Sequence, residues 1–177
     1  MRYRRADVKG GTYFFTVNLA QRHLCLLSDH VEILRAAVKT VKQRHPFRID
    51  AFVVLPDHLH AIWTLPSDDA DFATRWMLIK SAFSHCIAIN ERRSASRISK
   101  GERGIWQRRY WEHLIRDDAD FERHVDYVHY NPVKHGHVSQ ASEWPYSSIH
   151  RYIKAGIIAN DWGGGIDCNG EGGYGER

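Results

Sequence analysis

The sequence predicts an α+β fold in which an antiparallel sheet carries helices on one face. Short β-branched and aromatic segments alternate with longer segments of helical periodicity. The apolar runs 49–54 and 58–65 are separated by only three residues, which include the turn-forming pair Pro56-Asp57. The 177 residues are 43% hydrophobic and 26% charged, as in an ordinary globular domain. The element order β-α-β-β-α-β-α is that of the ferredoxin-like or RNA-recognition-type plan, whose sheet leaves one face open to a ligand.

The first half of the chain supplies three strands and one helix. The aromatic and β-branched segment 12–19 follows two glycines and predicts the first strand. A helix begins near Ser28 or Asp29, carries an apolar stripe, and ends near Arg44, ahead of His45-Pro46. The runs 49–54 and 58–65 then form an antiparallel pair of strands.

The second half adds two helices and one strand. Apolar residues recur at helical spacing between residues 71 and 90, and this stripe indicates core. The segment 91–103 is rich in arginine and lacks periodicity, so we expect a basic loop. A fourth strand over 106–116 leads into a helix that begins after Asp117 and is stopped by Pro132. We expect one domain over residues 1–160 and a flexible, glycine-rich tail over 161–177.

Net charge indicates the kind of binding partner, and the cysteine content indicates the redox state of the compartment. A net charge of +4 with 12 histidines favours a polyanionic partner. Cys25, Cys86 and Cys168 are widely spaced, so they predict neither a disulfide framework nor a cysteine zinc site, and they fit a reducing cytoplasm. No run approaches the length that spans a bilayer, and no signal peptide is evident.

Two histidines lie two positions apart in the third predicted strand. Side chains alternate along a strand, so His58 and His60 point to the same face and Leu59 to the other. Two neutral imidazoles side by side can chelate one divalent cation. Local hydrogen bonding of two strand histidines is the alternative interpretation of this short pattern.

The last long helix carries a second group of polar side chains on one face. Tyr127 and Asn131 are four residues apart, and His124 lies three before Tyr127. The Asn131 amide oxygen could complete a His58/His60 metal site, and the Tyr127 phenol could then attack a metal-bound phosphorus. A core position for the Tyr127 ring, with its hydroxyl at the edge, is the alternative.

These motifs together resemble a known family. His58-Leu59-His60 is similar to the His-hydrophobic-His (HUH) motif of the single-tyrosine transposases of insertion sequences. The segments 124–127 (HVDY) and 130–136 (YNPVKHG) are similar to the helix that carries their catalytic tyrosine. With 11–18 and 109–113, the set most resembles the REP-associated tyrosine transposases over roughly residues 3–162.

The resemblance implies an HUH-nuclease variant of the ferredoxin-like plan and a substrate of single-stranded DNA with a hairpin, of the repetitive extragenic palindrome kind. It implies that His58, His60 and Asn131 hold Mg²⁺ or Mn²⁺. Tyr127 would cleave the strand to leave a 5′-phosphotyrosine and a free 3′-hydroxyl. The resemblance leaves the oligomeric state open: the insertion-sequence relatives work as dimers, whereas this branch is associated with monomers. We expect a monomer, with a dimer as the alternative, located in the cytoplasm at the nucleoid.

Basic residues spread along the chain are the expected DNA contacts, through neutralisation of backbone phosphates. Two other functions remain open. A hydrolase could use the same metal to activate water, with Asp57 beside it. A non-catalytic nucleic-acid-binding module could use the same sheet without cleavage. The expected DNA-binding residues are Arg4, Arg5, Arg108, Arg109 and Lys134.

Overall fold

A computed structural model describes residues 7–163 of the chain. Arg4, Arg5 and residues 164–177 lie outside the described residues, and with them most of the predicted tail. No helix in the described part is both long enough and apolar enough to cross a membrane.

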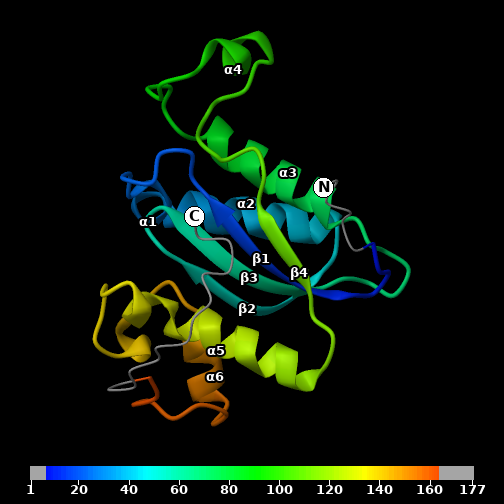
Figure 1. The fold of residues 1–177 in the computed structure, drawn as a ribbon, viewed down its shortest axis with the longest axis vertical. Helices are drawn as coiled ribbons and strands as arrows, with labels where there is room; N and C mark the ends of the chain where they lie inside the picture. Colours follow the sequence, from blue (N-terminus) through cyan, green and yellow to red (C-terminus); the bar gives the residue numbers. More distant parts are fainter. Residues whose placement is uncertain (1–6, 164–177) are drawn as a thin grey trace, which may run out of the picture.

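Four antiparallel strands form one sheet in the order β2-β3-β1-β4 (Figure 1). Asn18 of β1 pairs with His58 of β3, and Thr16 pairs with both His60 and Trp111 of β4. This order and the antiparallel pairing of β2 with β3 confirm the predicted α+β plan. The strands are β1 (Thr12–Asn18), β2 (Arg48–Val54), β3 (His58–Thr64) and β4 (Trp111–Leu114).

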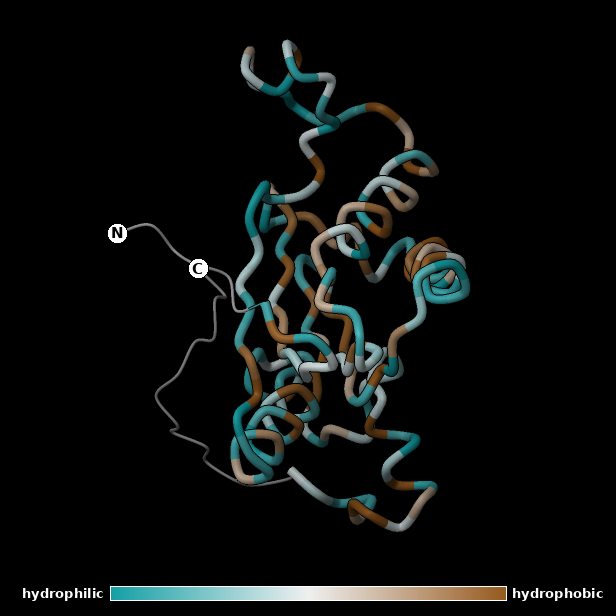
Figure 2. The backbone as a smooth tube through the Cα atoms, turned by 90° about the vertical axis from the view of Figure 1, so that its right-hand side faces the viewer, coloured by the Kyte–Doolittle hydropathy of each residue, from teal (hydrophilic) through white to brown (hydrophobic). Residues whose placement is uncertain are grey.

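The two crossover helices, α2 (Val31–Arg44) and α3 (Phe72–His85), cover one face of this sheet (Figure 1). The short helix α1 (Leu26–Asp29) leads into α2. Large rings fill this layer: Trp63 of β3 stacks on Trp76 of α3 with ring centroids 4.2 Å apart. Brown, hydrophobic stretches of the tube run through the middle of the molecule in Figure 2. The burial of rings such as Trp63 and Trp76 stabilises this layer.

The helix α5 (Asp118–Lys134) lies on the opposite face, which corrects the expectation that helices cover one face only. Val125 and Val128 of α5 pack on Phe14 and Ile62, whose side chains point away from α2 and α3. Alternation along β1 and β3 makes both faces apolar, so the sheet needs cover on both sides. The face expected to be open is therefore occupied by the helix that carries Tyr127.

The C-terminal end of α5 differs from the prediction at Pro132, which lies inside the helix instead of stopping it. In the last turn a proline removes one backbone donor without ending the helix. The helix ends at Lys134, and Gly136 beyond it has a φ of +70°, a conformation that favours glycine. The amide of His137 donates to the carbonyl of Pro132 at 2.9 Å, and that of Gly136 to Val133 at 2.9 Å, which together form a Schellman cap.

The segment expected to be a basic loop contains the short helix α4 (Ala95–Ser99) and stands away from the sheet (Figure 1). Arg103 ties this segment to α3, because its guanidinium donates to the Ser84 carbonyl at 2.6 Å and pairs with Glu91 at 2.6 Å. After α5 the chain forms a 3₁₀ turn, η1 (Ala141–Glu143), and the helix α6 (Ile149–Lys154).

Candidate active site

The strand β3 holds His58 and His60 on the face covered by α5, with their ring centroids 5.0 Å apart. Both imidazoles are buried, and each Nδ1 has a polar neighbour. The Asp57 carboxylate lies 2.7 Å from Nδ1 of His58, and the Thr16 hydroxyl lies 2.9 Å from Nδ1 of His60. Such contacts orient a metal-binding imidazole and leave Nε2 as its ligand atom.

Both histidines are held in the neutral state that binds metal ions. Burial lowers the pKa of His58, although the hydrogen bond with Asp57 opposes the effect. Burial and the neighbouring His58 lower the pKa of His60 well below its usual range. A neutral imidazole has a lone pair available for a cation, so the donor set fits a divalent metal.

Tyr127 lies beside this pair in the same chain. Its half-buried ring is 5.2 Å from the ring of His60 and 5.9 Å from that of Phe14, between centroids. Phe14 also contacts His60 at 5.5 Å and His124 at 4.9 Å. Phe14 therefore packs against both His60 of β3 and Tyr127 of α5. The sequence did not predict this contact, because Phe14 is one of several aromatic residues in its strand.

Asn131, one turn after Tyr127, is fully buried, and its side chain acts on His58 by raising that group's pKa against the effect of burial. The structure thus brings together the four residues His58, His60, Tyr127 and Asn131 that were predicted from separate motifs. His135 joins them, with its ring 5.1 Å from that of His58. Burial and the neighbouring His58 lower the pKa of His135 to about 4.

Lys134 was expected to contact DNA phosphates, but its ammonium group lies at the predicted nucleophile. Lys134 Nζ donates to the Tyr127 hydroxyl at 3.1 Å and lies 4.7 Å from the centre of the Tyr127 ring. Burial lowers the pKa of Lys134. The two residues are seven apart, two turns of helix, so the spacing was a readable signal that they share a face.

The expected DNA contacts Arg108 and Arg109 precede β4, and both are exposed. The preceding residue, Gln107, donates its amide to the carbonyl of Asn18 at 3.0 Å. Asn18 pairs with His58, so this segment passes the end of the sheet that holds the histidine pair. Arg108 forms an ion pair with Glu102 at 2.8 Å.

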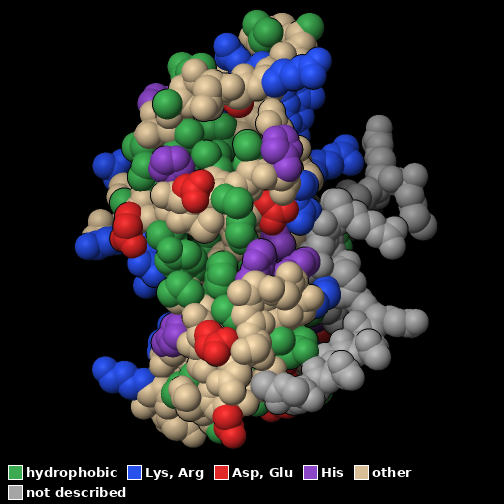
Figure 3. All heavy atoms as spheres, turned by 90° about the vertical axis from the view of Figure 1, so that its left-hand side faces the viewer, with side chains coloured by type: hydrophobic (Ala, Val, Ile, Leu, Met, Phe, Trp, Pro, Cys, Tyr) green, Lys and Arg blue, Asp and Glu red, His purple; other side chains and the backbone are tan. Residues whose placement is uncertain are grey.

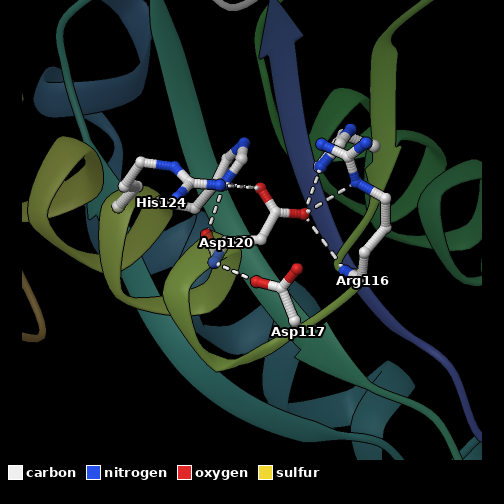
Figure 4. Close-up of polar contacts among 6 residues, drawn as sticks. Arg116, Asp117, Asp120 and His124 are labelled. Carbon is white, nitrogen blue, oxygen red and sulfur yellow. Dashed lines mark hydrogen bonds and ion pairs between the residues drawn. The ribbon is translucent and has the colours of Figure 1, made fainter.

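The first turn of α5 is anchored by a polar cluster centred on Asp120 (Figure 4). The Asp117 carboxylate caps the helix by accepting from the Asp120 amide at 2.8 Å. The buried Asp120 carboxylate accepts from His113 Nε2 at 2.8 Å and from the Arg116 amide at 3.1 Å. These hydrogen bonds outweigh burial and hold the pKa of Asp120 far below its usual range. The cluster joins α5 to β4, and Asp120 lies seven residues, about two helical turns, before Tyr127.

The same cluster has the spacing of a metal site. Ligand atoms of His113, Asp120 and His124 all lie within 4.8 Å of one another, and together they could hold a metal ion. The Asp120 carboxylate, however, also lies 3.5 Å from the guanidinium of Arg116 and 3.3 Å from that of Arg123. Two guanidinium groups already neutralise the one carboxylate, which opposes the entry of a further cation. At the histidine pair the Arg22 guanidinium lies 3.4 Å from Nδ1 of His58, the ring nitrogen that also contacts Asp57, and not at its Nε2.

Known proteins are similar to this chain in sequence and in fold. A REP-associated tyrosine transposase of Escherichia coli K12 is 48% identical over 164 residues, which cover 93% of this chain and 92% of that protein. A Haemophilus influenzae protein, whose description also names a REP-associated tyrosine transposase, is 46% identical over 170 residues, with 93% and 94% covered. No protein-family model matches the chain.

Among solved structures, one of a REP-associated tyrosine transposase bound to a REP hairpin is 46% identical and superposes with a TM-score of 0.85. The match covers 100% of this chain and 98% of that one. Sequence identity at this level over nearly the full length of both proteins settles the family. The chain therefore belongs to the REP-associated tyrosine transposases, the family that its paired histidines and its tyrosine helix resemble.

Proposed function

We propose that this protein is a metal-dependent endonuclease and strand transferase for single-stranded DNA that forms hairpins of the repetitive extragenic palindrome kind. The observation that carries the proposal is the 5.2 Å separation between the rings of Tyr127 and His60. Both residues belong to one chain, so a monomer contains a complete set of side chains. The bound REP hairpin of the solved relative supports this class of substrate. We place the reaction at the nucleoid in the cytoplasm.

In this proposal the Tyr127 hydroxyl is the nucleophile. Its oxygen forms a bond to the scissile phosphorus while the bond from phosphorus to the 3′-oxygen breaks. The products are a 5′-phosphotyrosine and a strand whose 3′-oxygen takes up a proton. Because the tyrosyl phosphodiester retains the energy of the broken bond, a 3′-hydroxyl can later attack it and rejoin a strand.

His58, His60 and Asn131 would hold Mg²⁺ or Mn²⁺. When bound, such a cation neutralises and orients the scissile phosphate. The chain's own contribution is positional: Asp57 and Thr16 hold the imidazoles by their Nδ1 atoms, and Lys134 holds the phenol oxygen. A phenol has a pKa near 10, so a neighbouring ammonium group favours its ionised, nucleophilic form.

The DNA strand would contact Arg108 and Arg109, which lie next to the sheet end that holds His58. Lys134 lies close enough to the nucleophile to contact the scissile phosphate itself. Arg4 and Arg5, outside the described residues, stay expected contacts of the N-terminal arm.

Denaturing electrophoresis of the protein after incubation with labelled hairpin DNA and Mn²⁺ tests the proposal. We expect a labelled band of protein size that survives denaturation and disappears in Tyr127→Phe. Tyr130→Phe is the matched control, because Tyr130 lies on the same helix and packs on Trp162 at 6.4 Å, away from His60. Cleavage that persists in Tyr127→Phe without a covalent band would instead establish water as the nucleophile.

The water-activating alternative has less support, because Asp57 is a poor base. Although burial opposes ionisation, hydrogen bonds from His58 and Arg22 lower the pKa of Asp57 to about 2. A carboxylate with so low a pKa removes protons from water inefficiently. The remaining alternative, a binding module without catalysis, predicts hairpin binding that chelators leave unchanged and no cleavage with any divalent cation.

A further inference from the structure

A row of ring side chains leads from His58 across the surface, away from the sheet centre. The His135 ring lies 5.1 Å from that of His58 and 6.2 Å from that of His137, between centroids. Trp144 stacks on His137 at 5.2 Å, and Tyr146 lies 5.7 Å beyond Trp144. His135 and His137 are exposed, and Trp144 and Tyr146 are half-buried. We name His135, His137, Trp144 and Tyr146 the ring track. Figure 3 shows histidine side chains gathered near the middle of the face that it draws.

The Trp144 and Tyr146 end of the ring track is hydrogen-bonded to the edge strand β2. The indole nitrogen of Trp144 donates to the carbonyl of Val54 at 2.9 Å, and the Val54 amide donates to the carbonyl of Tyr146 at 2.9 Å. Ser148 extends this pairing by donating its amide to Phe52 at 2.8 Å. A surface held in place before binding loses little conformational entropy when a ligand stacks on it.

The ring track ends in a groove between α2 and β2. The cavity has a volume of about 360 Å³, within the range of small-molecule pockets. Its floor is apolar and its rim is basic, with the guanidinium of Arg35 at 5.8 Å from the centre of the Tyr146 ring. The floor includes Leu34, Val38, Ile49, Phe52 and Tyr146, and the rim includes Arg35, Lys39 and Lys42.

The basic residues of the rim form one row along α2. Arg35, Lys39 and Lys42 follow each other at spacings of four and three residues, so they share one helix face. Arg35 pairs with Glu32 at 2.5 Å. Neither exposed lysine has an ion-pair partner among residues 7–163, so both ammonium groups can neutralise an anionic ligand.

We propose that the ring track and this groove bind the unpaired DNA that flanks the hairpin on its way from the tyrosine centre. The inference rests on the proposed function, since it assigns a path to that same substrate. Sites for single-stranded DNA combine rings on which bases stack with cations along the phosphates, and both features occur here in sequence. An acidic peptide would satisfy the lysines, but it gives no reason for a row of rings continuous with His58.

Fluorescence anisotropy with a hairpin carrying flanks of zero, four or eight nucleotides, on either end, tests the path. We expect a flank on one end to tighten binding to the wild-type protein. Lys39→Ala/Lys42→Ala should remove about tenfold of that gain and leave the blunt hairpin bound as before. The salt dependence should fall by about 1.4 in log–log slope, since each neutralised phosphate of a single strand contributes about 0.7.

The matched control is Arg44→Ala/Lys154→Ala, which removes two exposed charges that do not line the groove. It should keep the flank gain, whereas His137→Ala, a change at an exposed ring, should reduce it. A flank gain that is equal in all variants would overturn the inference. So would a wild-type dimer that Lys39→Ala/Lys42→Ala dissociates in sedimentation, because a second copy would then occupy the groove.

The covalent tyrosine band, measured on the eight-nucleotide substrate, separates this inference from the proposed function. A band without any flank gain rejects only the path along the ring track. A flank gain that the lysine variants lose, without a covalent band, rejects only the cleavage reaction.

Discussion

Lys134 donates a hydrogen bond of 3.1 Å to the hydroxyl of Tyr127, and its ammonium group lies 4.7 Å from the centre of that ring. The two residues are seven apart on α5, about two helical turns. In the proposed reaction a cation at this position would stabilise the phenolate and the charge that develops on the phosphate. The two residues are therefore best understood as a unit.

Replacing Lys134 tests that unit. We expect Lys134→Met to slow single-turnover formation of the covalent band about 10- to 100-fold, because a neutral side chain neither donates to the phenol oxygen nor stabilises its charge. Hairpin affinity should fall by a smaller factor than the rate, because Lys134 contributes only one of the expected phosphate contacts. Lys134→Arg should recover part of the rate, and equal rates for all three proteins would contradict the assignment.

Thr16 offers a test of which histidine cluster holds the metal. We expect Thr16→Val to weaken Mn²⁺ binding about 10- to 100-fold in calorimetric titration, because the Thr16 hydroxyl orients His60 through its Nδ1. Thr12→Val is the control, since Thr12 contacts Thr64 at the far end of the same strand pair.

His113→Ala completes the metal experiment. It should leave Mn²⁺ affinity unchanged, because the Asp120 carboxylate beside it is already neutralised by Arg116 and Arg123. Loss of Mn²⁺ binding in His113→Ala, with normal binding in Thr16→Val, would move the metal to the cluster of His113, Asp120 and His124.

The anchor at Asp120 should contribute strongly to folding. We expect Asp120→Asn to lower the free energy of unfolding by about 2–3 kcal/mol, because a neutral amide oxygen accepts the buried hydrogen bonds from His113 and the Arg116 amide more weakly than the charged carboxylate does. Urea denaturation measures the change. Asp118→Asn, an exposed position in the same helical turn, should cost well under 1 kcal/mol, and a similar cost for both would refute the anchor.

His129 predicts how stability depends on pH. Its fully buried ring contacts Ser148 at 2.9 Å, and burial lowers its pKa from 6.5 to about 4. Below pH 6.5 the unfolded chain therefore binds a proton that the folded chain excludes until near pH 4. Its contribution to stability is complete above pH 6.5 and decreases as pH falls through this window, by on the order of 3 kcal/mol.

Unfolding in urea at pH 7.5 and pH 5 measures this loss. Other buried histidines also lower the free energy of unfolding as the pH falls. The contribution of His129 is therefore the difference between two proteins: His129→Gln should lose less stability between pH 7.5 and pH 5 than the wild-type protein does. His23→Gln, at an exposed position, should keep the wild-type difference. An unchanged pH dependence in His129→Gln would show that the ring is protonated equally in both states.

Much of the fold was readable in the chain. β-branched and aromatic residues predict the strands at 12–18 and 58–64. The spacing of apolar side chains predicts the helix α3. The antiparallel orientation of β2 and β3 also followed, because the turn at Pro56-Asp57 is too short for a parallel connection. The family followed from motifs that lie far apart in the sequence.

The sequence by itself determined local features of the structure. These are which side chains alternate between the faces of a strand, which side chains share a helix face, and that His58 and His60 point to the same face of one strand. Only the tertiary structure decided that α5 crosses the second face of the sheet, which puts Tyr127 beside His60 and Lys134 beside Tyr127. Periodicity reports which side of an element is apolar, but the partner of that side is chosen by the packing of Phe14 and Ile62 against Val125 and Val128. No local pattern contains that choice.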